Sequence, residues 1–155
     1  MRKTVTKTTD EKIKDNLLRW FNAAKAEEYK AGINWYSEAQ QFTHNLAKAY
    51  DLDPYKVAGV VSALSPNNKW ERNKIDAETV VKAHLSGIGP DSVKVCTYNA
   101  NKNKAFEILK GNTEITAKSP KTHAFAMNVG LNSPQHITVD KWHLRACVVG
   151  PVEGI

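Results

Sequence analysis

The chain has 155 residues, 41% of them hydrophobic and 8% aromatic, with a formal net charge of +6 at pH 7. This is the size of one domain, and the hydrophobic fraction excludes wholesale disorder. Lys and Arg outnumber Asp and Glu by 22 to 16, which favours a polyanionic partner, nucleic acid before a membrane, although a merely basic protein shows the same balance.

The first third of the chain predicts two amphipathic helices. Residues 1–9 have the polar composition of a flexible arm. Thr9 can cap a first helix that begins at residue 10 and ends near Gly32. Asn34 can cap a second helix that runs to about residue 50.

A buried helix is predicted next. Asp53-Pro54 combines a capping side chain with proline at the first helical position, which is a strong helix start. The helix over 54–64 is apolar nearly all round, so we place it in the core. It must stop at Ser65-Pro66, because proline disfavours helical geometry in the residue before it. Asn67-Asn68-Lys69 is then a polar loop tip.

The remaining elements are also helical. Ile137 to Val139 is the only strand-like run, and it is too short to form a sheet. We therefore expect an all-α fold. One helix is expected over 70–85, with Ile75 and Val80 inward, and another over 99–110, closed by Gly111. A third is expected from about Lys121 to Gly130–Pro134, and a last one begins at its cap, Asp140.

Cysteine usage and the chain start bear on the compartment. Cys96 and Cys147 are far apart in sequence and cannot supply the clustered ligands of a zinc or iron–sulfur site. The start, MRKTVTKTTD, has charge but no apolar segment behind it, unlike a secretory signal. No apolar run approaches the roughly 18 residues that span a bilayer. We therefore expect a soluble cytoplasmic protein that binds no metal and no cofactor.

Four pieces of the sequence, in this order, resemble a known family. They are Leu64-Ser65-Pro66-Asn67 with Asn73-Lys74, Tyr98 to Ala105, Lys121-Thr122, and Val139-Asp140-Lys141-Trp142-His143-x-Arg145. Together they resemble the helix-hairpin-helix superfamily of endonuclease III-like DNA glycosylases, over roughly residues 57–147. The resemblance implies a helical bundle of that type, in a small divergent member closer to those of phages than to housekeeping repair enzymes.

The chain departs from the family pattern. The hairpin glycines whose amides hold a DNA phosphate are replaced by Lys118-Ser119-Pro120. We therefore expect that this phosphate contact is altered, or that Lys118 and Ser119 take it over. The chain ends where relatives continue, so most of the C-terminal part of the second lobe is expected to be lacking. One alternative is that the chain is shortened there. The other is that the helices over 10–50 complete the cleft, together with a second copy or a partner chain. These helices are expected to pack on the 54–155 core in one domain.

Two residues match the catalytic groups of the family. Asp140 takes the place of the aspartate that stabilises the oxocarbenium-like sugar or orients the nucleophile, and an ordinary helix cap is the alternative. Lys121 takes the place of the lysine that forms a Schiff base with C1′ in bifunctional members. The alternative is a solvated lysine near a DNA phosphate, in which case the enzyme would use water.

The resemblance also implies a DNA-binding surface. Asn67 and Asn68 lie where relatives insert a side chain into the gap left by an extruded base, although a plain turn is the alternative. Phosphate contacts are expected from polar and basic residues for which a solvated helix face is the alternative: Lys69, Arg72, Lys74, Lys102, Lys104, Lys118, Ser119 and Arg145.

These features predict a DNA N-glycosylase, or a glycosylase-like enzyme, that extrudes a normal or modified base from double-stranded DNA and acts at the C1′–N bond. Two alternatives stay open. One is a catalytically inactive DNA-binding module on the same scaffold, and the other is a phage enzyme that processes modified thymine, located in the host cytoplasm.

Overall fold

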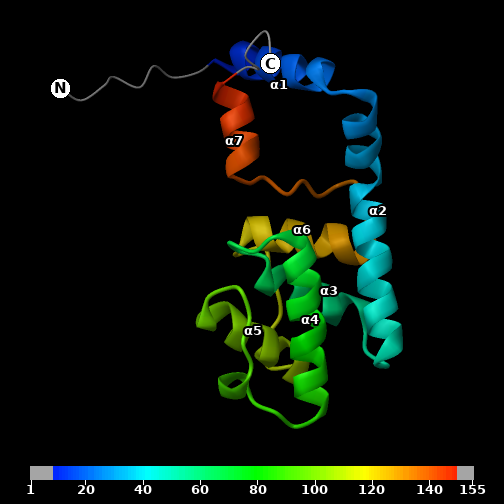
Figure 1. Cartoon of the computed structure of the whole chain (residues 1–155). Coiled ribbons are helices and arrows are strands. Elements are labelled where there is room, and N and C mark those ends of the chain that lie inside the picture. The colour runs from blue at the N-terminus through cyan, green and yellow to red at the C-terminus, as the bar shows by residue number, and fades with distance from the viewer. Residues whose placement is uncertain (1–8, 150–155) are drawn as a thin grey trace, which may run out of the picture. The chain divides into compact units, whose positions relative to one another are not determined.

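The computed structural model describes residues 9–149, and every regular element in this part of the chain is helical, which confirms the all-α fold class. The predicted arm over residues 1–9 lies, apart from Thr9, outside the described residues. None of the described helices is long and apolar enough to cross a bilayer. The elements, labelled in Figure 1, are α1 (Asp10–Ala23), α2 (Ala26–Ala49), α3 (Pro54–Leu64), α4 (Trp70–Leu85), η1 (Pro90–Ser92), α5 (Asn99–Lys110), α6 (Pro120–Leu131) and α7 (Lys141–Val148).

Local sequence signals set several helix ends as predicted. Asp53 caps α3, where its Oδ1 accepts the N–H of Lys56 at 2.8 Å, and Pro54 occupies the first helical position. Gly111 ends α5 with a φ of 78°, in the left-handed region where a Cβ would be strained. The caps of α3 and α5 are therefore confirmed.

The boundary predicted at Gly32 is wrong. Helix α1 ends at Ala23, and α2 continues through Gly32 without a break. The break falls at Ala24, which is extended, and the N–H of Lys25 is accepted by the Glu28 carboxylate at 2.8 Å. That bond is one half of a capping box, so the glutamate in the first turn of α2 sets the boundary.

The described chain forms two compact units. Of the described residues, 9–33 and 139–149 belong to unit 1, and Asn34–Thr138 belong to unit 2. The boundary in the first half of the chain lies within α2. The single domain expected over residues 10–155 stays a prediction.

Helix α3 forms the centre of unit 2. All residues from Val57 to Leu64 are buried, as the sequence predicts, and the helix packs against α6, α5 and α4 (Figure 1). A fully buried Val or Leu side chain stabilises the fold by about 1.5–3 kcal/mol. At the α3–α6 contact, a Cβ built on Gly130 would lie 2.9 Å from the Cβ of Ala58. The two helices can therefore approach closely because residue 130 is glycine.

Aromatic side chains cover α4 on the side of α2. The Trp70 ring lies 5.1 Å from that of Trp35 and 5.8 Å from that of Phe42, between ring centroids, so Trp70 has a packing role. Val80 is buried as predicted, whereas Ile75 is 55% exposed, which corrects its inward placement. The inward face of α4 also carries two buried polar side chains, Asn73 and Asp76.

Unit 1 packs α1 against α7 and buries little. Among its described residues only Asn16 is buried, and its side-chain amide donates to the carbonyl of Cys147 at 2.9 Å. Trp20 Nε1 donates to the carbonyl of Val149 at 2.6 Å. Hydrogen bonds thus link the two helices, while many of their apolar side chains stay exposed.

Candidate functional site

A buried carboxylate anchors the loop between α3 and α4. Asp76, fully buried on α4, accepts hydrogen bonds from Asn68 Nδ2 at 2.9 Å, Arg72 Nε at 2.9 Å and the backbone N–H of Cys96 at 2.8 Å. Hydrogen bonds to a charged group contribute about 1.5–3 kcal/mol each. Asp76 therefore joins the loop after α3 to the segment before α5. Its signal in the sequence is an aspartate at helical spacing from the buried positions 73 and 80.

Further hydrogen bonds hold the tip of this loop. Asn67 has a φ of 57°, and its side-chain amide donates to the hydroxyl of Tyr98 at 2.8 Å. Thr97 Oγ1 donates to the carbonyl of Pro66 at 2.8 Å and accepts from Asn101 Nδ2 at the same distance. The loop tip is therefore tied to the start of α5, a contact that the sequence did not predict.

The first turn of α6 is anchored on the core helix. Ser62 of α3 is buried, and its hydroxyl donates to the carbonyl of Thr122 at 2.6 Å. Thr122 Oγ1 in turn donates to the carbonyl of Ser119 at 3.1 Å. Pro120 occupies the first helical position, as is common, and the preceding Ser119 makes no side-chain cap. The first backbone amides of α6 therefore lack a side-chain cap, and the helix dipole at this end favours an anion.

A hollow of about 320 Å³ opens beside this turn and brings predicted residues together. Lys104 from α5 and Lys121 from α6 both line it, as does Ser119. Pro66, the neighbour of Asn67 in the loop tip, lines it as well. No carboxylate is among its lining residues, so we call it the basic hollow; it consists of Ala63, Pro66, Asn101, Lys104, Ile115, Ser119, Pro120, Lys121 and Thr122.

Other residues predicted to contact phosphate have internal partners. Lys102 is only 6% exposed, and its Nζ donates to the carbonyl of Val93 at 2.8 Å, which corrects its predicted place on a DNA-binding surface. The Arg72 guanidinium pairs with buried Asp76. Lys74 pairs with Glu71 at 2.8 Å.

Three other residues expected to contact DNA do not line the basic hollow. Lys69 and Lys118 are exposed in unit 2, outside the basic hollow. In unit 1, the guanidinium carbon of Arg145 lies 4.8 Å from the centroid of the Trp142 ring, a cation–π contact.

Asp140 caps α7 in unit 1, as the sequence predicts. Its Oδ1 accepts the backbone N–H of Trp142 at 2.8 Å and that of His143 at 3.1 Å, and His143 Nδ1 lies 3.1 Å from the same oxygen. Burial raises the pKa of this carboxyl, but the hydrogen bonds from His143 and the backbone amides outweigh burial and hold the pKa below its usual value. Asp140 is therefore a carboxylate at neutral pH, and Oδ2 takes no part in these bonds.

Lys121 and Asp140 belong to different units, Lys121 to unit 2 and Asp140 to unit 1. A cleft shared by the two groups stays a prediction. Their local settings differ. Lys121 is exposed at the basic hollow, whereas the Asp140 side chain is 30% exposed and engaged at a helix start.

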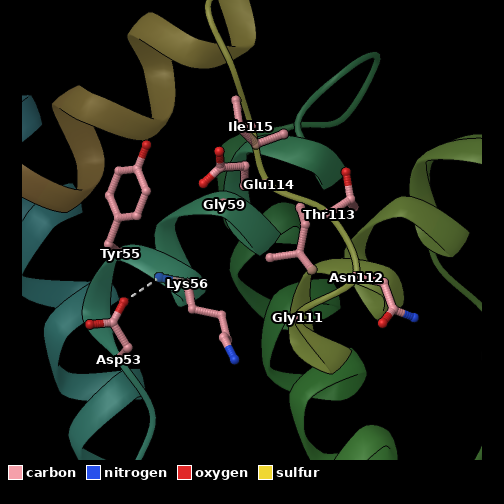
Figure 2. A pocket seen from close by; sticks show the side chains of 10 residues that line it. Asp53, Tyr55, Lys56, Gly59, Gly111, Asn112, Thr113, Glu114 and Ile115 are labelled. Atoms are coloured by element: carbon pink, nitrogen blue, oxygen red, sulfur yellow. Dashed lines mark hydrogen bonds between the residues drawn. The ribbon is translucent and has the colours of Figure 1, made fainter.

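A second hollow, of about 400 Å³, lies at the start of α3. Figure 2 shows the side chains of Tyr55, Thr113 and Glu114 arranged around Gly59 of α3. We call it the Gly59 hollow, and it is lined by Asp53, Tyr55, Lys56, Gly59, Ile108, Gly111, Asn112, Thr113, Glu114 and Ile115. The sequence did not predict this hollow. Its one indication is Gly59 itself, because a glycine inside a helix costs about 1 kcal/mol relative to alanine and so suggests a packing or functional reason.

Metal-ligand groups do not converge in residues 9–149, where no three His, Cys, Asp or Glu side chains lie together. His123 and His136 do lie side by side, with ring centroids 5.4 Å apart, and His136 Nδ1 is 2.8 Å from the hydroxyl of Ser133.

Comparisons with known proteins place the chain in one family. Residues 1–154 match the family described as "Family of unknown function (DUF7178)". No curated protein matches the chain, and no solved structure does. Because the family match extends over nearly the whole sequence, the chain belongs to DUF7178.

Proposed function

We propose that the chain binds DNA at the basic hollow and acts there as an N-glycosylase or glycosylase-like enzyme on an extruded nucleotide. The observation that carries the proposal is that Lys104, Lys121 and the first turn of α6 line one hollow that has no carboxylate. Two ammonium groups and a helix start favour a phosphate oxygen in the same place. The net charge of +6 supports a polyanionic partner in the same way.

The loop tip beside the basic hollow suits the extrusion of a base. Extrusion costs a few kcal/mol and requires a side chain to fill the gap in the duplex. Asn67 is exposed at the tip, and the bonds made by Asn67, Thr97 and Asp76 hold the loop in place before DNA arrives. A pre-formed loop avoids the entropic cost of ordering it on binding.

In the proposed reaction, Asp140 stabilises the positive charge that develops on the sugar as the base departs. Its pKa is below the usual value, which keeps the carboxylate ionised for this role. Lys121 would either attack C1′ after losing its proton or hold a phosphate while water attacks. A cytoplasmic location, in a phage host if the chain is phage-encoded, belongs to the same proposal.

A catalytically inactive DNA-binding module is the second candidate. The observation that favours it is the engagement of Asp140 Oδ1 by two backbone amides and His143, which is the arrangement of an ordinary helix cap. The phage enzyme for modified thymine would share the proposed site and differ in the base it accepts.

Base release separates the enzyme from the inactive module. Duplexes carrying uracil, oxidised, alkylated or hypermodified bases are incubated with the protein, and free base is measured. We expect release from at least one duplex and its loss in Asp140→Asn, because asparagine keeps the cap but not the charge. DNA binding without release from any duplex would exclude the enzyme and leave the module.

The role of Lys121 is tested by borohydride reduction with DNA that contains an abasic site. An amine that forms an imine with C1′ becomes covalently attached to the DNA. If Lys121 is the nucleophile, the adduct forms in the wild type and disappears in Lys121→Ala. If base is released but no adduct forms, water is the nucleophile and Lys121 is limited to phosphate binding.

A further inference from the structure

The Gly59 hollow adjoins the basic hollow. Ile115 lines both of them. Gly59 lines the first and Ala63 the second, and residues four positions apart lie on the same face of a helix, here α3. The two hollows therefore share a wall formed by Ile115.

The charges around the Gly59 hollow select against a strongly charged occupant. Asp53 and Glu114 contribute carboxylates, which disfavour an anion. Lys56 contributes an ammonium group, which disfavours a cation, and its Nζ lies 3.4 Å from the carbonyl of Leu109. A neutral molecule with both hydrogen-bond donors and acceptors matches this set, because carboxylates accept and ammonium groups donate.

The shape and the floor of the Gly59 hollow add a second condition. Its volume of about 400 Å³ lies in the range of small-molecule sites. The floor consists of Gly59 and the side chains of Ile108 and Ile115, which are buried and apolar. An apolar floor with polar groups at the rim suits a flat heterocycle, whose faces are apolar and whose edges form hydrogen bonds.

We infer that the Gly59 hollow receives the base of a nucleotide whose phosphate is held at the basic hollow. The base lies over Gly59 and Ile115, and its edge bonds to Glu114 and Thr113. The phosphate lies at Lys104 and Lys121. This inference rests on the proposed function, and the same chemistry is offered by a free nucleotide and by a nucleotide extruded from DNA.

Amide shifts in NMR test the inference with probes that do or do not carry a base. The probes are the four deoxynucleoside 5′-monophosphates and deoxyribose 5-phosphate. We expect all of them to shift the amides of Lys121 and Thr122. Only probes with a base should also shift Gly59, Thr113 and Glu114. Shifts at Lys121 without any base-dependent shift around Gly59 would overturn the inference and leave the proposed function standing.

An oligonucleotide duplex with one mismatched pair, compared with its fully paired form, identifies the source of the base. Shifts around Gly59 with the mismatched duplex indicate an extruded base, and shifts with free nucleotides alone indicate a free ligand. Either result supports the inference. If neither DNA nor deoxyribose 5-phosphate shifts Lys121, the proposed function itself fails.

Two exposed positions of one loop provide a matched pair of variants. Glu114→Ala removes an acceptor at the rim of the Gly59 hollow, whereas Thr116→Ala alters a side chain that lines neither hollow. We expect Glu114→Ala to weaken nucleotide binding about tenfold, the usual effect of one charged hydrogen bond, and to leave deoxyribose 5-phosphate binding unchanged. Equal nucleotide affinity in the two variants would overturn the placement of the base.

Discussion

Unit 2 and unit 1 are both helical, but they are stabilised in different ways. Unit 2 is built around α3, whose residues from Val57 to Leu64 are all buried. In unit 1 the only buried residue among those described is Asn16, and polar bonds from Asn16 and Trp20 join α1 to α7. Apolar content alone therefore does not indicate a core, since α1 is rich in leucine and aromatic residues that remain exposed.

The candidate site follows the same division. Both hollows of the nucleotide proposal lie in unit 2, where buried groups such as Asp76 and Ser62 fix the surrounding loops. Asp140 lies in unit 1 at the start of α7, where local bonds hold it.

The largest effect is expected from truncating a core side chain. Phe106 of α5 is 1% exposed in unit 2, whereas Leu17 of α1 is 40% exposed in unit 1. We expect Phe106→Ala to lower the free energy of unfolding by about 3–5 kcal/mol, because it leaves a cavity. Leu17→Ala should cost about 0.5 kcal/mol or less. Urea denaturation followed by circular dichroism measures both; similar losses would contradict the contrast.

Two glycines in helices provide the next comparison. A Cβ on Gly130 would lie 2.9 Å from the Cβ of Ala58, whereas one on Gly32 would meet no atom within 4 Å. We expect Gly130→Ala to destabilise unit 2 by about 1–3 kcal/mol, since α6 must move away from α3. Gly32→Ala should stabilise α2 by up to about 1 kcal/mol. Thermal unfolding of the two variants measures the difference, and a change of the same sign in both would refute the close contact.

The smallest effect is expected at the cap of α7. Asp140→Ala should weaken this helix by about 1 kcal/mol, whereas Asp140→Asn should cost less because asparagine also caps. The pKa of Asp140 is lower in the folded state, so the stabilisation is present at neutral pH and is lost as the pH falls below about 4. Trp142 fluorescence, measured as a function of pH, reports the unfolding of α7. If the wild type and Asp140→Asn lost α7 over the same acidic pH range, the charge of Asp140 would not be what stabilises this helix.

The sequence predicted those features that depend on neighbouring residues. The Asp53-Pro54 start, the Gly111 end of α5 and the Asp140 cap are each set by a few adjacent residues. The predicted helix end at Gly32 was wrong. The hydrogen bond from the Lys25 N–H to the Glu28 carboxylate starts α2 before this glycine. No neighbouring atom lies within 4 Å of a Cβ built at Gly32, so packing does not require a glycine there.

Features that depend on distant contacts could not be predicted. The basic hollow combines α5 and the start of α6, and only Lys104, Ser119 and Lys121 of the expected residues line it. Lys102, two positions before Lys104, points instead to the Val93 carbonyl. Which lysine of α5 lines the hollow and which is buried depends on how the segment before α5 folds back over the helix. Local sequence patterns do not specify that fold.

The salt dependence of DNA affinity shows whether the basic hollow binds DNA phosphates. Lys104→Ala/Lys121→Ala removes both ammonium groups of the basic hollow, and Lys48→Ala removes an exposed lysine at the end of α2 as a control. We predict that the slope of log affinity against log salt is shallower by about two in the double variant, roughly one for each lost phosphate contact, and unchanged in Lys48→Ala. An unchanged slope in the double variant, or no DNA binding by the wild type, would contradict the account.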